Sequence, residues 1–300
     1  MNKTHSRFSF RPQRGLSLIE VLIALMLGVF LLGGVIQIFI INRQTYRTQE
    51  NLSRLQEDGR FALDLLNRYV RLAGYLSSET VYSTRYYDQK CEDRIDNVFG
   101  QRVYYKGSVP TMPPLAGTNN DSGDAKYKSD TISAAFQSPR KPTTTAGVTD
   151  LRLPDCLGNS VGQAGAARDT LANNRFYIAT NPATQRLALY CDPVHSDGTD
   201  PTAQPLLDGV ENMQVRYGRK MAGGNRAYLS ANQVTNMREI DTIQVRLLMS
   251  TADEINTQPQ PYTFDTDDNG IDETITPTDR RSRRVFTSTI ALRNTLGCTQ

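Results

Sequence analysis

The sequence predicts an α+β fold, in which one long N-terminal helix packs on an antiparallel β-sheet domain with long loops. Two observations predict it. Residues 16–75 contain no proline and change from a continuous apolar run to an amphipathic pattern. Beyond Gly74, short β-prone runs alternate with clusters of Pro, Gly, Thr, Asn and Asp, which are typical of turns. A long helix followed by several strands favours a helix that covers an antiparallel sheet.

The first part of the predicted helix is long and apolar enough to cross a membrane. Residues 16–41 read LSLIEVLIALMLGVFLLGGVIQIFII, and Glu20 is their only charge. Because a helix rises by about 1.5 Å per residue, this run spans a hydrocarbon core of roughly 30 Å. The preceding residues contain no acid and carry four positive charges, at Lys3, Arg7, Arg11 and Arg14. Positive flanks stay on the cytoplasmic side, so we expect the rest of the chain to lie outside the inner membrane.

Glu20 distinguishes this segment from ordinary targeting sequences. A secretory signal has an apolar region of about 7–15 residues followed by a small-residue cleavage site, and this run is longer and has no such site. A plain signal anchor remains an alternative, but it gives no reason for a carboxylate inside the span. Since a lone acid in a membrane helix costs about 2.5–3.5 kcal/mol, we take Glu20 as a functional candidate.

The helix is expected to continue from residue 42 to about Tyr75. Apolar residues recur there at steps of three or four, while the opposite face is charged. The simplest interpretation is one helix of about 60 residues, near 90 Å long at the standard rise. A break at Asn42 or Gly59 is the alternative.

Six runs beyond the helix are predicted to be strands. They are Asp130–Phe136, Arg175–Thr180, Arg186–Cys191, Gly209–Tyr217, Ile240–Ser250 and Arg284–Arg293. The second and third runs form a predicted hairpin, because an Asn-Pro turn separates them. Three stretches are predicted to be irregular, namely Ser77–Lys128, Ser138–Asn174 and Met221–Arg238.

Charge and cysteine usage restrict the function classes. The net charge is +3 and the basic residues before residue 16 account for it, so nothing indicates a nucleic-acid-binding surface. The four cysteines are dispersed and form no CxxC pair: Cys91, Cys156, Cys191 and Cys298. In an exported domain they predict two disulfides, with three connectivities open, whereas free buried thiols are the alternative.

An acidic loop at residues 265–273, DTDDNGIDE, is the candidate cation site. Alternating oxygen-bearing side chains followed by Gly270 match the start of an EF-hand calcium loop. The twelfth position in that register is Thr276 instead of glutamate, so Asp272 or Glu273 would have to complete the site. We take calcium binding as a hypothesis and a solvated acidic turn as its alternative. The candidate ligands are Asp265, Asp267, Asn269 and Glu273.

The sequence gives no positive indication of catalysis. His195 lies in CDPVHSDGTD beside several acids, but a lone histidine in a polar loop is usually a surface residue. No P-loop, GxSxG or HExxH motif occurs. We therefore expect a protein that is not an enzyme.

The segment RGLSLIEVLIAL resembles the class III signal of type IV prepilins and type II secretion pseudopilins. In that family a basic leader ends in Gly, and a mature helix with Glu at its fifth position follows. The resemblance implies that a prepilin peptidase cuts between Gly15 and Leu16 and N-methylates Leu16, although the family usually has Phe first. Glu20 would be the fifth mature residue, and its carboxylate could neutralise the new amine within the chain or from a neighbouring subunit.

Four further segments resemble the PilW group of type IV pilus minor pilins: NRYVRLAGY, LLDGVENMQVRYG, DTIQVRLLMST and RRVFTSTIALRN. They cover the helix end and three strands, and the middle of the chain is not covered. The resemblance implies a pilin-like fold and a minor-pilin complex that initiates pilus assembly and sits at the tip. Its partners would be other minor pilins, the major pilin and often a tip adhesin, which implies roles in twitching motility and cell adhesion.

Two alternative functions remain open. The first alternative is a type II secretion minor pseudopilin, and the second, less favoured one is a calcium-dependent adhesive ectodomain on a plain membrane anchor. We expect a leader at 1–15, a transmembrane helix at 16–41, an exported continuation of the helix at 42–75 and a β-rich exported domain at 76–300. The chain would span the inner membrane once, with its C-terminal domain in the periplasm, and would enter the pilus on assembly.

Overall fold

The computed structural model describes residues 15, 17–76, 113–119, 128–138, 153–161, 170–196, 198, 200–221, 223–266 and 269–294. The chain divides into two compact units, residues 1–50 and residues 51–300. Each unit is described by itself.

Helix α1 spans Leu18–Val70 and has no break at Asn42 or Gly59, so the prediction of one continuous helix is confirmed. Its side chains before residue 51 are exposed almost throughout. An 18-residue window has a mean hydropathy of 2.6 and none of it is buried, so α1 is long and apolar enough to cross a membrane. The helix ends before the predicted Tyr75, because a turn follows in which Gly74 adopts a φ of +74°.

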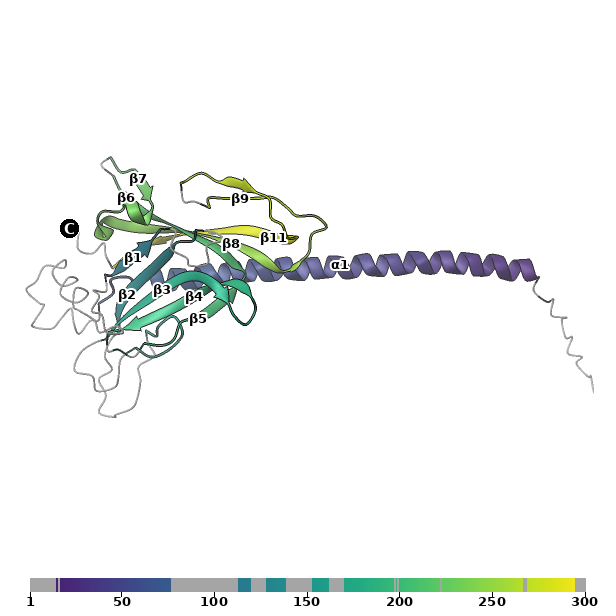
Figure 1. Cartoon of the computed structure of the whole chain (residues 1–300), viewed down its shortest axis with the longest axis horizontal. Helices are drawn as coiled ribbons and strands as arrows, with labels where there is room; N and C mark the ends of the chain where they lie inside the picture. Colours follow the sequence, from purple (N-terminus) through teal and green to yellow (C-terminus); the bar gives the residue numbers. More distant parts are fainter. Residues whose placement is uncertain are drawn as a thin grey trace, which may run out of the picture. The chain divides into compact units, whose positions relative to one another are not determined.

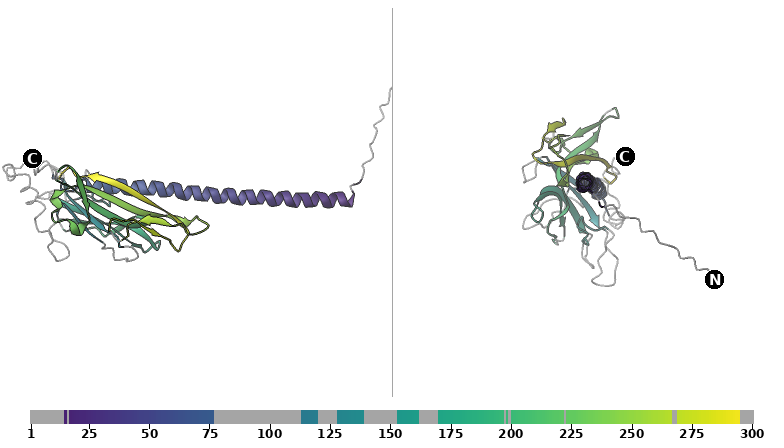
Figure 2. Two further views of the ribbon diagram at one scale, coloured as in Figure 1. Left: turned by 90° about the horizontal axis from the view of Figure 1, so that it is seen from above. Right: turned by 90° about the vertical axis from the view of Figure 1, so that its right-hand side faces the viewer.

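The described residues of the second unit form three antiparallel sheets (Figures 1 and 2). The five-stranded sheet has the order β1-β2-β3-β4-β5, from Leu115–Thr118, Thr131–Ser138, Thr170–Asn181, Arg186–His195 and Gln204–Asp208. The four-stranded sheet has the order β11-β8-β6-β7, from Arg281–Ala291, Ile240–Glu254, Val210–Lys220 and Arg226–Leu229. A two-stranded sheet pairs β9 with β10, at Tyr262–Phe264 and Glu273–Ile275. Two 3-10 turns, Ala231–Gln233 and Met237–Glu239, lead into β8.

All six predicted strands overlap observed ones, and the α+β class is confirmed. The predicted hairpin is β3–β4, with Tyr177 opposite Tyr190. The prediction of three irregular stretches was only partly correct. Strand β1, the start of β3, and β7 with both 3-10 turns lie inside them. Strands β1 and β7 have four residues each, too few for an alternating pattern to be recognised.

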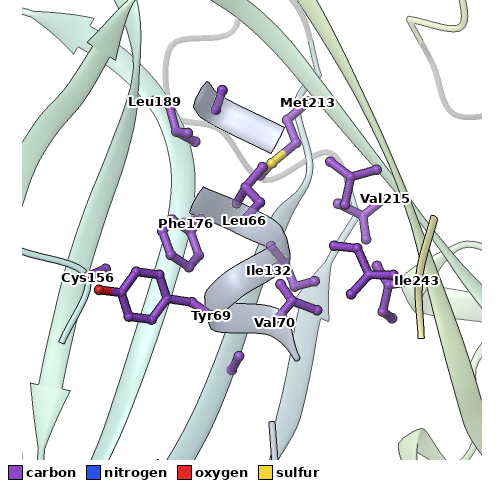
Figure 3. Packing of buried hydrophobic residues seen from close by; sticks show 14 of the residues in the cluster. Leu66, Tyr69, Val70, Ile132, Cys156, Phe176, Leu189, Met213, Val215 and Ile243 are labelled. Atoms are coloured by element: carbon purple, nitrogen blue, oxygen red, sulfur yellow. The ribbon is translucent and has the colours of Figure 1, made fainter. Parts of the chain in front are cut away.

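The core of the second unit lies around the last four turns of α1. Buried residues recur on this helix mainly at steps of three or four, so one face is covered: Asn51, Leu55, Gly59, Ala62, Leu66, Tyr69 and Val70. Figure 3 shows Leu66, Tyr69 and Val70 between side chains of the two larger sheets. Phe176 and Leu189 come from the five-stranded sheet, and Met213, Val215 and Ile243 come from the four-stranded sheet.

Three contacts join the helix to late parts of the chain. Asn51 Nδ2 donates to Asp253 Oδ2 and the Asp253 backbone N–H donates to Asn51 Oδ1, both at 3.3 Å. A Cβ atom at Gly59 would lie 2.5 Å from the Phe286 ring, so this close approach requires glycine. At the helix end, Asn294 donates to the Arg71 carbonyl at 3.0 Å.

The two larger sheets meet along a seam. The Met213 N–H donates to Ser129 Oγ at 3.0 Å, and the Val215 N–H donates to Asp130 Oδ2 at 2.8 Å. The Asp130 N–H donates to the Met213 carbonyl at 2.8 Å. The segment before β2 thus satisfies backbone groups of β6 that β7 does not reach.

Candidate functional site

The start of α1 holds the candidate processing residues. Ser17 precedes the helix, and the Glu20 N–H donates to both Ser17 Oγ (3.3 Å) and the Ser17 carbonyl (3.0 Å). Ser17 is therefore an N-cap, and Glu20 is the acidic residue of the first turn, where the helix dipole favours a negative charge. Gly15 and Glu20 are exposed, and Leu16 lies outside the described residues.

This geometry gives Ser17 a local role that sequence reasoning missed, because its hydroxyl accepts from the Glu20 backbone N–H. The spacing Ser17-x-x-Glu20 is the pattern of a capping box, and it was visible in the sequence. A test of Glu20 in assembly therefore has to separate its charge from its effect on the helix start. Cleavage after Gly15 and methylation of Leu16 stay predictions.

One disulfide is present in the described part of the chain, between Cys156 and Cys191. Their Cα atoms lie 6.3 Å apart and the two residues are 35 positions apart in sequence. Both side chains are buried. Cys91 and Cys298 lie outside the described residues, so their predicted pairing stays untested.

The disulfide belongs to a buried polar cluster that we call the pinned junction, residues 153–161 with their contacts. The Asp155 carbonyl accepts a hydrogen bond from the Tyr69 hydroxyl of α1 at 2.7 Å. Asp155 Oδ1 accepts from the Leu157 and Asn159 N–H groups at 2.9 and 2.8 Å. Asp155 Oδ2 lies 3.2 Å from His195 Nε2. Burial alone would raise the pKa of Asp155, but hydrogen bonds from His195 and Asn159 outweigh it and lower the pKa.

The expectation that His195 is a surface residue is wrong. His195 is the last residue of β4 and only 1% exposed. Its imidazole faces Asp155, and the nearby Asp200 accepts from the His195 backbone N–H at 2.8 Å. Cys156 and Cys191 form a disulfide, and together with the His195–Asp155 contact it joins β4 to the junction.

The acidic loop folds around Asp265, which is 2% exposed. Asp265 Oδ1 accepts from the Asn269 N–H at 3.0 Å, and Oδ2 accepts from the Gly270 N–H at 2.9 Å. The predicted sharp turn at Gly270 is present, with a φ of +89°. Arg216 of β6 also donates to Asp265 Oδ2 at 3.1 Å, so this carboxylate already faces a cation.

Glu273, another candidate ligand in the described part of the loop, forms hydrogen bonds within the loop. Glu273 Oε2 accepts from the Thr266 N–H at 3.1 Å, and Asp267 lies outside the described residues. Among the residues that the structure describes, no group of three or more His, Cys, Asp or Glu side chains could hold a metal ion. Calcium binding stays a prediction, and Arg216 would compete with the ion for Asp265.

Arginines of the four-stranded sheet hold residues 255–280, which we call the clamped arm. Arg246 lies 2.8 Å from Asp272 and 5.3 Å from the centre of the Phe264 ring. Arg283, which is only 4% exposed, contacts Glu211 and Asp279 at 2.7 Å each. The hydrogen bond from Arg283 lowers the pKa of Asp279 to about 2. Burial lowers the pKa of Arg283, but hydrogen bonds to Asp279 and Glu211 outweigh it and raise that pKa.

Two family profiles match the chain. Residues 175–294 match the family described as Type IV Pilus-assembly protein W (PilW). Residues 10–36 match the prokaryotic N-terminal methylation motif. The first match covers most of β3 and all later strands, and the second covers Gly15, Leu16 and Glu20.

Similarity to individual proteins is low. A solved structure of a type IV-like pilin from Thermus thermophilus has 13% sequence identity and a TM-score of 0.41, with 80% of this chain and 97% of that chain covered. No curated protein gives a significant sequence match. The chain thus resembles type IV pilins in two separate segments, the methylation motif at residues 10–36 and the PilW domain at residues 175–294.

Proposed function

We propose that this chain is a minor pilin that takes part in initiating assembly of a type IV pilus and caps its tip. The observation that carries the proposal is the presence of both matched segments on one chain: a methylation motif at the start and a PilW domain at the end. Among the described residues, one helix is long and apolar enough for a membrane, and it begins within the matched motif. After processing, the chain would remain in the inner membrane, with the β-rich unit in the periplasm, until it is incorporated into the filament.

Glu20 would act in this step through its charge. Prepilin peptidase would cut between Gly15 and Leu16, which leaves a positive, N-methylated amine at Leu16. A carboxylate in the first helical turn is the nearest group able to neutralise that amine in an apolar environment, within the chain or across to a neighbouring subunit. The partners would be the peptidase, other minor pilins, the major pilin and a tip adhesin.

Processing is tested by intact-mass and N-terminal analysis of the membrane-extracted chain. We expect a start at methylated Leu16, and retention of residues 1–15 would contradict the proposal. Gly15→Val should block cleavage by adding bulk at the cut. Glu20→Gln should still be cleaved but should fail to enter pili, because it keeps the size of the side chain and loses the charge.

Ser17→Ala is the matched control for Glu20→Gln. It removes the N-cap, at a cost of about 1 kcal/mol to the helix start, and leaves the carboxylate in place. If Ser17→Ala abolishes assembly as fully as Glu20→Gln, the charge of Glu20 is not the specific requirement, because loss of the N-cap alone then has the same effect.

A type II secretion minor pseudopilin is the alternative, since the resemblance of the N-terminal segment covers both systems. Deletion of the gene separates them. Loss of surface pili and of twitching supports the pilus role, whereas blocked export of secreted enzymes with intact pili would assign the chain to secretion.

A further inference from the structure

The loop that joins β9 to β10 contains the one Asn-Gly pair of the whole sequence, Asn269–Gly270. Both residues are exposed, so water reaches them. Because glycine has no Cβ, its backbone nitrogen approaches the preceding asparagine side chain with little steric hindrance. In an open chain, this nitrogen can attack the side-chain amide of the asparagine. The loop of the clamped arm therefore contains a reactive pair of residues.

The reaction of this pair needs water and neither an enzyme nor an oxidant. The Gly270 nitrogen loses its proton to water and attacks Cγ of Asn269, and the new N–Cγ bond closes a succinimide ring. The Cγ–Nδ2 bond then breaks, and the nitrogen takes up a proton and leaves as ammonia. Water opens the ring at either carbonyl, which leaves an aspartate or a backbone-lengthened isoaspartate at position 269. In sum, water replaces ammonia and the chain gains one negative charge.

Three hydrogen bonds hold both reacting groups in the folded loop. The Gly270 N–H donates to Asp265 Oδ2 at 2.9 Å, and the Asn269 N–H donates to Asp265 Oδ1 at 3.0 Å. The Ile271 N–H donates to Asn269 Oδ1 at 2.7 Å, which fixes the side-chain amide. The negative charge of Asp265 also opposes loss of the proton from the Gly270 nitrogen beside it. The closed loop thus disfavours the attack both by geometry and by charge.

Asp265 is itself held by the four-stranded sheet. Its side chain is 2% exposed, and Arg216 of β6 donates to Asp265 Oδ2 at 3.1 Å. A hydrogen bond to a charged group shifts a local equilibrium by at least about tenfold. The loop is therefore open in only a small fraction of folded molecules. When opening is fast relative to the reaction, the observed rate is the rate of the open loop multiplied by that fraction.

We propose that Asn269–Gly270 is a deamidation site, and that Asp265 keeps it unreactive in the folded chain. Opening of the loop starts the reaction, and both products keep the loop open. An isoaspartate lengthens the backbone between the two N–H groups that Asp265 binds. An aspartate replaces the amide nitrogen, which lies 3.5 Å from Glu273 Oε1, with a carboxylate oxygen that this glutamate repels. The modification therefore makes a transient opening of the arm irreversible.

The test incubates the full chain in detergent micelles at neutral pH and follows position 269 by peptide mapping with mass spectrometry. This method separates the asparagine, aspartate and isoaspartate forms. We expect the folded, unaltered chain to deamidate more than about tenfold more slowly than the same chain unfolded in guanidinium chloride. In folded Asp265→Ala, the rate should rise by at least about tenfold towards that of the unfolded chain.

Asp272→Ala is the matched control for Asp265→Ala. It removes an equal charge from the same loop and breaks the contact with Arg246, but it leaves the bonds of Asp265 in place. Its deamidation rate should stay within about twofold of the unaltered rate.

Arg216→Gln is a second test that does not depend on the folding of Asp265→Ala. It removes the contact of Asp265 with β6 and keeps the bonds within the loop. Its rate should lie between those of Asp272→Ala and Asp265→Ala. Urea unfolding of each variant confirms that it is folded at the start of the incubation.

Four results would overturn the inference. Equal rates in the folded and unfolded chain would mean that the loop is not held closed, and absence of reaction in the unfolded chain would mean that the pair is not reactive. A slower reaction in Asp265→Ala would mean that the carboxylate promotes the attack as a base. Equal rates in Asp265→Ala and Asp272→Ala would assign the effect to net charge. None of these results bears on processing at Leu16, which mass analysis of the N-terminus tests separately.

Discussion

The pinned junction and the clamped arm are two irregular segments of one unit, and different interactions hold them in place. At the junction, a disulfide and buried hydrogen bonds tie residues 153–161 to β4 and to Tyr69 of α1. In the arm, residues 255–280 are held by arginines, and two of the acidic partners, Asp272 and Asp279, are partly exposed. The junction therefore supports the core helix directly, whereas the arm is attached through its side-chain charges.

This difference predicts which changes unfold the unit and which loosen one segment. Loss of the junction contacts should destabilise the helix and the sheet that contains β4. Loss of the contacts in the arm should have a local effect unless it leaves a buried charge without a partner. The following four changes test this, from the largest expected effect to the smallest.

Replacing Cys156 and Cys191 with Ser should have the largest effect. The chain-entropy argument for a bond between residues 35 positions apart gives a loss of about 4 kcal/mol in the free energy of unfolding. Urea unfolding of the soluble part of the unit or of the full chain in detergent measures it. Reduction of the unaltered chain should give at least this loss, because it also breaks the predicted bond between Cys91 and Cys298. A loss below about 1 kcal/mol would mean that the hydrogen bonds alone fix the junction.

Arg283→Ala should cost about 3 kcal/mol, because it leaves the buried carboxylate of Glu211 without its partner. This is the one change near the arm that we expect to destabilise the whole unit. Arg284→Ala, at the exposed neighbouring position, is the control and should change stability by less than about 0.5 kcal/mol. Equal effects of both variants would contradict a specific role of the buried pair.

Tyr69→Phe should cost about 1.5 kcal/mol, since it leaves the Asp155 carbonyl without its 2.7 Å donor. Hydrogen exchange should become faster in residues 153–161 and in the last turn of α1, which share this bond. Exchange in the clamped arm should not change. If the arm responds as strongly as the junction, the two segments are coupled and the comparison fails.

Asp279→Asn should cost about 1 kcal/mol at neutral pH, after allowance for the 32% exposure of this side chain. The sign follows from the pKa of Asp279, which falls from 3.8 to about 2 in the folded chain. A depressed pKa gives stability that is present above pH 3.8 and is lost as the pH falls towards 2. The unaltered chain and the variant should therefore converge near pH 2. A difference that persists there would indicate a packing effect.

Much of the fold follows from local sequence patterns. The long helix, the β3–β4 hairpin and the long strands β6, β8 and β11 have clear periodicity, and each was predicted near its observed position. Strands of three or four residues, such as β9, contain too few residues to show it.

The sites were less predictable, because their contacts join distant residues. Cys156 was one of three possible partners for Cys191 until the fold placed them together. His195 was misjudged since its partner Asp155 belongs to a segment far earlier in the chain. Ser17 and the Glu20 backbone, by contrast, interact within one turn, and the sequence alone could have revealed the capping role of Ser17.

The contacts between α1 and the last strands also set an order of events during synthesis. Asn51, Gly59 and Arg71 leave the ribosome long before their partners Asp253, Phe286 and Asn294. The largest of these separations is 223 residues. Part of the apolar face of the helix therefore stays uncovered until almost the whole chain has been synthesised. Contacts of such long range slow folding and prolong exposure to aggregation. Tethering by the membrane segment would keep neighbouring nascent chains apart during this delay.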